Sequence, residues 1–235
     1  MSEILFETST IGDGNMSFKF GAEAEVNENR QRFVEECGIP VNRHICMACD
    51  HGEEIIAVNR DTRGVGALSQ TEMPVAEVLV TNEPRIALMV LTADCLPMGF
   101  YDPVRKVIAL AHVSRKTTTH RLAQKTISFL HETYDSNPAD IHVTVGPYIH
   151  TRSYAFPTPL ESIDETLTDH ITYKNNRAYV DLQSANRAQL TAAGVPAKQI
   201  IFSDIDTYTS PDHFSHMKSK ETGEQDGRIA TIMML

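Results

Sequence analysis

The sequence has no tryptophan, and only four of its 235 residues are cysteine. Its core must therefore rely on leucine, isoleucine, valine, methionine and phenylalanine, and the hydrophobic content of 41% is enough for a sizeable core. No apolar run reaches the roughly 18 residues that a membrane-spanning helix needs. The first residues lack the basic segment and apolar centre of a signal peptide. We therefore expect a cytoplasmic protein that does not enter a membrane.

Basic residues are scarce as well, with 21 Lys and Arg against 31 Asp and Glu and a net charge of −10. A general nucleic-acid-binding protein would show a basic face, so that class is disfavoured, although a local basic pocket for a phosphate is compatible with this charge. In a reducing cytoplasm the cysteines are expected to be thiols, ligands or core residues rather than disulfides. They are Cys37, Cys46, Cys49 and Cys95.

The order of apolar runs and turn signals predicts an α/β fold. Strands and helices alternate in the middle of the chain but not at its ends, which favours an α/β sandwich of mixed sheets over a doubly wound parallel sheet. Strands are expected at residues 75–81, 86–91, 107–111, 141–145, 200–202 and 229–234, and helices at residues 29–37, 117–134 and 182–193. The other segments are interpreted as a hairpin-like start (1–20), a linker (59–75), a turn between two central strands (101–103), an acidic irregular stretch (157–175) and a polar tail (210–227).

Each of the two central apolar runs leads to a side chain that can bind a metal. Residues 86–91 lead to Cys95, and residues 107–111 lead directly to His112. Thiolate and imidazole are the ligands that zinc prefers, and a third such residue, His51, lies upstream. Three protein ligands with an open fourth position are typical of a catalytic zinc site. Asp94 is a candidate orienting carboxylate or general acid/base beside it.

The residues alone leave two other interpretations of this stretch open. Cys95 and His112 follow apolar runs, so both can be inert core residues. Alternatively, Cys95 can be a nucleophile that His112 activates, as in thiol hydrolases.

Cys46 and Cys49 form a Cys-x-x-Cys pair, which can be a redox pair or half of a zinc knuckle. The sequence has no second such pair, and Asp50-His51-Gly52 does not continue as a helix. We therefore favour the simpler interpretation that both cysteines are strand residues leading to His51.

A basic cluster follows His112 where a loop is expected to become a helix. Helix N-termini bind anions, so this cluster can hold a phosphate or a nucleotide-like substrate near the metal. A solvated helix face is the alternative. The cluster consists of Arg115, Lys116, His120 and Arg121.

Together these residues resemble, in order, the YfiH-like family (DUF152), formerly described as multicopper polyphenol oxidases or laccases. The most specific segment is Thr92-Ala93-Asp94-Cys95-Leu96-Pro97, and the similarity covers nearly the whole chain. Supporting segments are Asn29-Arg30, Asp50-His51-Gly52, Val80-Thr81-Asn82, Ala111-His112, Val145-Gly146-Pro147-Tyr148-Ile149 with Tyr154, Asp181-Leu182 with Ala185-Asn186-Arg187-Ala188-Gln189-Leu190, and Asp226-Gly227-Arg228.

The resemblance implies a single α/β sandwich domain over residues 1–235 with a mononuclear zinc site formed by His51, Cys95 and His112. It implies phosphorolysis of adenosine, inosine or methylthioadenosine, and adenosine deamination in some members. Purine nucleoside and phosphate are then the expected partners of a monomer or small homo-oligomer. Copper is the alternative metal, but laccase chemistry needs several coppers and many more histidines.

The chain departs from the family pattern at three places. Cys49-Asp50 replaces Gln-Val, Arg115-Lys116 replaces Trp-Arg, and His216-Met217-Lys218 replaces Tyr-Arg-Arg. Lysine does not reproduce the bidentate phosphate contacts of arginine, so a metal-binding or regulatory homologue with reduced or altered activity is the alternative. For the enzyme we expect Asp94, Arg115 and Lys116 to act in catalysis, and Arg115, Lys116 and Lys218 to hold substrate or phosphate.

Overall fold

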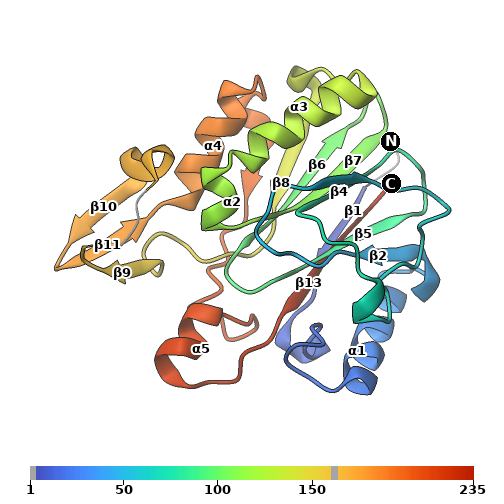
Figure 1. Ribbon diagram of the computed structural model, residues 1–235, viewed down its shortest axis with the longest axis horizontal. Coiled ribbons are helices and arrows are strands. Elements are labelled where there is room, and N and C mark those ends of the chain that lie inside the picture. The colour runs from blue at the N-terminus through green and yellow to red at the C-terminus, as the bar shows by residue number, and fades with distance from the viewer. Residues whose placement is uncertain (1–3, 160–163) are drawn as a thin grey trace.

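Two β-sheets stacked face to face form the centre of the computed structural model, which describes residues 4–159 and 164–235 (Figure 1). The four-stranded sheet has the order β1 (Leu5–Thr8), β13 (Ile229–Met234), β5 (Ala87–Thr92) and β2 (His44–Cys46). The six-stranded sheet has the order β12 (Ile200–Phe202), β8 (His142–Val145), β6 (Leu96–Asp102), β7 (Val107–Val113), β4 (Val78–Thr81) and β3 (Ile55–Ala57).

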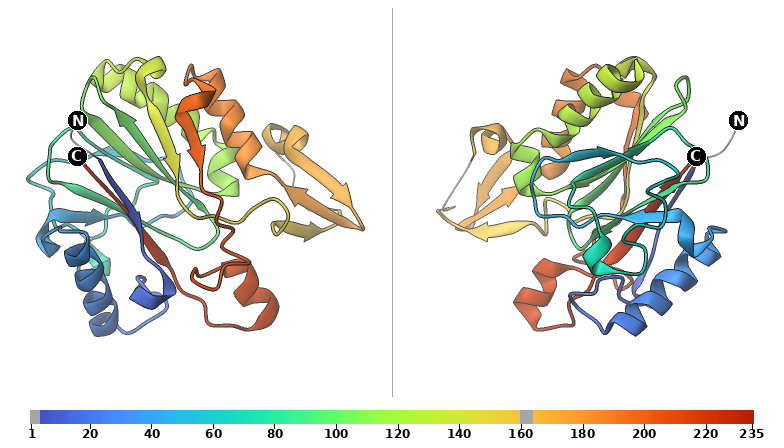
Figure 2. Two further views of the ribbon diagram at one scale, coloured as in Figure 1. Left: turned by 180° about the vertical axis from the view of Figure 1, so that it is seen from behind. Right: turned by 45° about the vertical axis from the view of Figure 1, so that its right-hand side comes forward.

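Helices cover the outer face of each sheet, on opposite sides of the molecule (Figure 2). Against the larger sheet pack α2 (Arg115–Thr119), α3 (Leu122–Tyr134) and α4 (Leu182–Ala192), and against the smaller sheet packs α1 (Glu23–Glu36). Both parallel and antiparallel pairs occur in the larger sheet. The predicted mixed-sheet α/β sandwich is thus confirmed.

Strand β7 explains why the central apolar run is continuous. Its residues are all buried, because Ile108 and Leu110 pack on the smaller sheet while Val107, Ala109 and Ala111 pack on the helices. A strand buried on both faces shows no polar alternation.

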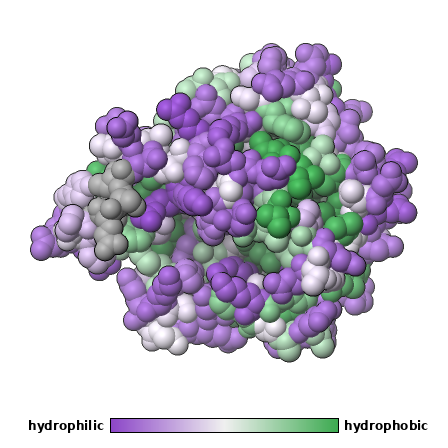
Figure 3. Space-filling view, viewed as in Figure 1, coloured by the Kyte–Doolittle hydropathy of each residue, from purple (hydrophilic) through white to green (hydrophobic). Residues whose placement is uncertain are grey.

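Hydrophilic side chains cover most of the face shown in Figure 3, which is hollowed between α2 and α5 (His216–Thr222). None of the helices within the described residues has both the length and the apolar character of a membrane span.

The two central apolar runs, residues 86–91 and 107–111, do not form neighbouring strands. The turn predicted at residues 101–103 lies at residues 103–106. β5 belongs to the smaller sheet and β7 to the larger, and the unpredicted strand β6 lies between them in the chain. Pro97 and Gly99 conceal β6, since both residue types are rare inside strands. Gly99 is required because a Cβ there would lie 2.7 Å from the ring of Phe6.

Other segments also differ from the prediction. The start of the chain is not a hairpin, because β1 pairs with the C-terminal β13. The helix expected at residues 117–134 is broken at Arg121, whose φ of 58° ends α2 and begins α3. The predicted polar tail contains α5.

The stretch 157–175 is more regular than predicted. It contains a 3₁₀ helix (Glu165–His170) and β10 (Ile171–Lys174), which joins β11 (Arg177–Val180) and β9 (Ala155–Pro157) in a small projecting sheet. Residues 160–163 of this stretch lie outside the described residues.

Candidate metal centre

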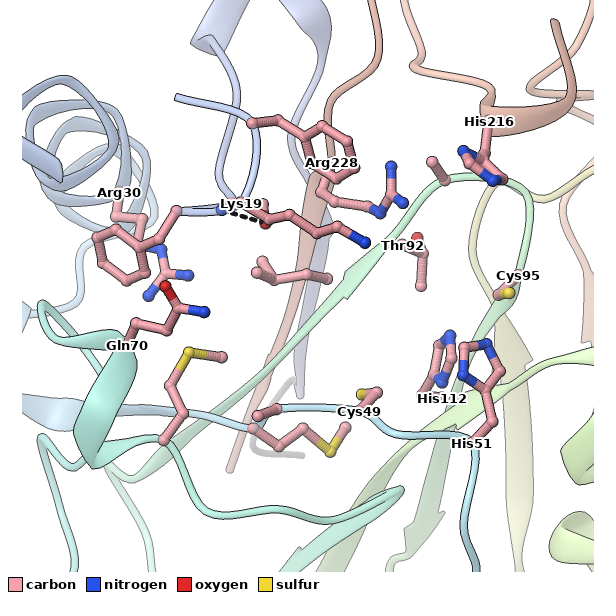
Figure 4. Close-up of a pocket in the computed structure, with 18 residues that line it drawn as sticks. Lys19, Arg30, Cys49, His51, Gln70, Thr92, Cys95, His112, His216 and Arg228 are labelled. Carbon is pink, nitrogen blue, oxygen red and sulfur yellow. Dashed lines mark hydrogen bonds between the residues drawn. The ribbon is translucent and has the colours of Figure 1, made fainter. Parts of the chain in front are cut away.

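His51, Cys95 and His112 meet at one end of a cavity, although they come from three separate segments (Figure 4). His51 lies in the loop after β2, Cys95 in the turn where the chain crosses from one sheet to the other, and His112 in β7. One nitrogen or sulfur atom of each lies within 4.8 Å of those of the other two. The two imidazole rings meet edge to face, with centroids 5.2 Å apart.

A buried carboxylate, Glu77, holds two of these residues in place. Its Oε2 lies 2.7 Å from His112 Nδ1, so that nitrogen carries the proton and Nε2 is left as the metal-binding atom. Its Oε1 accepts hydrogen bonds from the backbone N–H groups of Asp50 (2.9 Å) and His51 (2.7 Å). This fixes His51, whose φ of 64° lies in the left-handed region. The sequence signal for Glu77 is one acidic residue inside an apolar run.

The electrostatics of Cys95 favour a metal-binding thiolate. Burial raises the pKa of this thiol, but His112 and His51 beside it lower it to about 7. A zinc ligand must be deprotonated, and a depressed thiol pKa makes the thiolate available near neutral pH. One thiolate and two imidazoles, one of them held by a carboxylate, are a donor set that fits zinc.

Cys49 belongs to a second cluster, in which its sulfur lies within 4.8 Å of ligand atoms of Glu77 and His112. Both clusters use His112, and both oxygens of Glu77 already accept hydrogen bonds. The two clusters among the described residues could therefore hold one metal ion rather than two. Cys46 packs in the core between β2 and α1, whereas Cys49 lines the cavity, and both are free thiols.

Asp94 lies in the turn that carries Cys95. Its hydrogen bonds connect this turn to α5 and to the segment before α5. Its carboxylate accepts hydrogen bonds from Thr207 Oγ1 and from the backbone N–H of Met217, each at 2.7 Å. The residue is buried, and burial raises the pKa of its carboxyl group. These contacts support a positioning role, while a part in proton transfer stays a prediction.

Replacing Asp94 by alanine is expected to lower the free energy of unfolding by about 2–4 kcal/mol, because two buried donors lose their acceptor. The residue also has a φ of 82°, which alanine adopts at a cost. Denaturant unfolding measures the change, with the exposed Asp204→Ala as the matched control. Equal stability of the two variants would contradict this role.

The basic residues predicted to hold substrate do not line the cavity. Arg115 lies over the ring of Phe156, with 4.9 Å from its guanidinium carbon to the ring centroid. Lys116 is exposed, and Lys218 pairs with Glu224 at 3.0 Å. Their roles in catalysis and binding stay predictions. The basic residues that follow His112 do not lie along one long helix, because the helix is broken at Arg121.

Other cationic side chains do line the cavity, which has a volume of about 400 Å³. In Figure 4, Lys19 and Arg228 lie across the cavity from His51 and His112, and the imidazole of His216 lies near Cys95. Arg228 lies over the ring of Phe20 at 4.4 Å and pairs with Asp226 at 2.7 Å. No short motif contains this group, because its members come from a turn near the start and from segments near the end of the chain.

The stacked mixed sheets define an α/β sandwich protein, the fold of the YfiH structure to which the chain is similar. The chain belongs to the family described as multi-copper polyphenol oxidoreductase laccase, whose profile matches residues 6–235. The predicted resemblance is thus confirmed.

Several relatives in this family carry the name purine nucleoside phosphorylase. YlmD of Geobacillus stearothermophilus, so named, is 30% identical over 217 residues, which cover 88% of this chain and 79% of YlmD. The crystal structure of YlmD from the same organism covers 99% of this chain and 92% of its own, with a TM-score of 0.89 and 26% identity. Bacillus licheniformis YfiH has a TM-score of 0.84 and 27% identity, covering 94% of this chain and 85% of its own.

Proposed function

We propose that this protein is a zinc-dependent purine nucleoside phosphorylase acting on adenosine, inosine or methylthioadenosine, with adenosine deamination as a possible second reaction. The observation that carries the proposal is the meeting of His51, Cys95 and His112 at one end of a cavity whose other side is cationic. The names of the relatives support the same reaction.

His51, Cys95 and His112 would hold the metal, with Glu77 orienting His112. A zinc ion bound there supplies Lewis-acid chemistry at an oxygen of the substrate or of water. Copper binds the same donor types, but both ligand clusters among the described residues share His112, so they make one mononuclear site. A laccase needs several coppers, and we therefore favour zinc.

The rest of the cavity suits a nucleoside and a phosphate. Its volume of about 400 Å³ falls within the range of small-molecule sites. Phe18 and Phe20 supply aromatic surface on which a purine can pack. Lys19 and Arg228 supply positive charge for the phosphate, and Arg228 can contact it with two N–H groups.

The test is to incubate zinc-loaded protein with adenosine or inosine, with and without phosphate. We expect free purine and ribose 1-phosphate only when phosphate is present, and any deaminated product in both cases. Chromatography separates these products. If none forms above the background of the Cys95→Ala variant, the proposal is wrong.

A metal-binding protein without turnover is the second candidate. It is favoured by the positions of Lys116 and Lys218, which replace family arginines and do not line the cavity. Steady-state turnover of any purine nucleoside by the wild-type protein would exclude it.

Replacing Lys19 by alanine is expected to raise the KM for phosphate by about tenfold or more, since a charged hydrogen bond contributes about 1.5–3 kcal/mol. The KM for the nucleoside should change much less. Lys116→Ala is the comparison, because the sequence predicted phosphate binding at that residue. A larger rise for Lys116→Ala than for Lys19→Ala would place the phosphate beside α2 instead.

A further inference from the structure

His216 lines the cavity and forms, with Asp226, a second carboxylate–imidazole pair. We propose that His216, held by Asp226, is the catalytic general acid that protonates the purine as it leaves, an inference that rests on the phosphorylase proposed above. The residue replaces a tyrosine of the YfiH-like pattern, so this assignment concerns this chain in particular.

The geometry leaves one nitrogen of His216 free for chemistry. Asp226 Oδ2 lies 2.7 Å from His216 Nδ1, while Oδ1 accepts from Arg228 Nη1 at 2.7 Å and from the backbone N–H of Gly227 at 2.9 Å. With Nδ1 taken, Nε2 is the atom that His216 can present to a ligand in the cavity. The arrangement parallels that of Glu77 and His112.

The backbone around His216 is anchored on both sides. Ser215 caps α5, its side chain accepting from the N–H of Lys218 at 3.2 Å. The next backbone N–H after His216, that of Met217, donates to Asp94 at 2.7 Å. Asp94 follows the strand β5 and directly precedes Cys95. A catalytic group needs such rigid support to keep a fixed distance from the reacting atoms.

The surrounding groups keep the carboxylate that holds His216 ionised. Burial raises the pKa of Asp226, but the hydrogen bond from His216 and the charge of Arg228 outweigh it and lower that pKa below its usual value. Asp226 is therefore ionised near neutral pH and accepts the hydrogen bond of His216 Nδ1. His216 is about 40% exposed, so its proton can be renewed from solvent or from phosphate.

The chemical step balances in atoms and charge. A phosphate oxygen forms a bond to C1′ of the ribose, and the bond from C1′ to N9 breaks with its electron pair moving into the purine. His216 Nε2 gives its proton to N7 of the purine, and Nε2 then takes the proton that hydrogen phosphate loses on forming ribose 1-phosphate. General acid catalysis of this kind contributes about 10²- to 10⁴-fold in rate.

The experiment compares two substrates in wild-type protein and in His216→Gln. Inosine needs protonation of its leaving group, whereas 7-methylinosine already carries a positive charge on the base and needs none. We expect the kcat for inosine to fall by about 10²- to 10⁴-fold. The kcat for 7-methylinosine should stay within about threefold, because its base leaves without a proton and the proton lost by phosphate can pass to solvent. Asp226→Asn should show a smaller loss with the same substrate dependence.

Three controls make the outcome specific. His142→Gln, at an exposed histidine on β8, should behave as wild type. Zinc content and thermal unfolding should be the same for wild type and His216→Gln, which excludes a damaged metal centre. Equal losses of kcat on both substrates, or no loss of kcat on inosine, would overturn the proposed role of His216 but not the phosphorylase proposal. Absence of cleavage of either nucleoside by the wild-type protein would overturn the phosphorylase proposal together with this inference.

Discussion

Replacing Cys95 by alanine is expected to weaken zinc binding by at least about a hundredfold, given the free energy that protein ligands contribute to structural zinc. The substitution removes the thiolate and leaves two imidazoles, one of them exposed. We expect nucleoside phosphorolysis to fall by about a thousandfold, because Lewis-acid stabilisation by a metal contributes several kcal/mol. Zinc titration with a competing chelator and initial-rate assays measure the two losses.

The matched control for this prediction is Cys37→Ala, which removes another partly buried thiol. Cys37 follows α1, lies outside the cavity, and its pKa is raised to about 11 by burial and nearby acidic groups. This variant should keep both zinc and activity. If Cys95→Ala keeps stoichiometric zinc while losing activity, Cys95 is a nucleophile rather than a ligand, and the thiol-hydrolase interpretation gains support.

Replacing Glu77 is expected to have the second-largest effect, on both stability and metal affinity. Glu77→Ala leaves His112 Nδ1 and two backbone N–H groups without an acceptor, and should lower the free energy of unfolding by about 3–5 kcal/mol. The substitution removes the hydrogen bonds of 2.7–2.9 Å that Glu77 accepts from His112, His51 and Asp50. Denaturant unfolding of the metal-free protein measures this change.

Glu77→Gln separates the metal effect from the stability effect. The amide oxygen can still accept from the backbone, but the amide nitrogen then faces His112 Nδ1 and favours the tautomer with the proton on Nε2. That tautomer cannot bind a metal through Nε2, so zinc affinity should fall by about 10- to 100-fold. The exposed Glu54→Gln is the control and should bind zinc as wild type does. Unchanged affinity in Glu77→Gln would show that His112 is not a ligand.

The elements that could be predicted from the sequence are those whose local pattern matches their final environment. β7 and β13 are mostly apolar because both of their faces are buried. α4 ends at Ala192, just before the predicted stop signals Gly194 and Pro196. β6 could not be predicted, since its proline and glycine are tolerated only by the particular packing of Phe6 against the strand. The break at Arg121 likewise depends on one left-handed residue rather than on composition.

Some residues of the candidate site could likewise be predicted from the sequence, and others could not. The three proposed ligands could be named from the order of short motifs, and the structure brings them together. Glu77, Lys19 and the His216–Asp226 pair could not be named, because each acts through contacts between segments far apart in the chain. A single acid in an apolar run, as at Glu77, is the one signal that sequence analysis could have used.

The most direct test of the central claim is to measure ribose 1-phosphate formation from inosine as zinc is added back to metal-free protein. The proposed site predicts that the rate rises in proportion to bound zinc, stops rising at one zinc per chain, and requires phosphate throughout. Full activity in the metal-free protein, or one tightly bound zinc per chain without any ribose 1-phosphate, would contradict a zinc-dependent nucleoside phosphorylase.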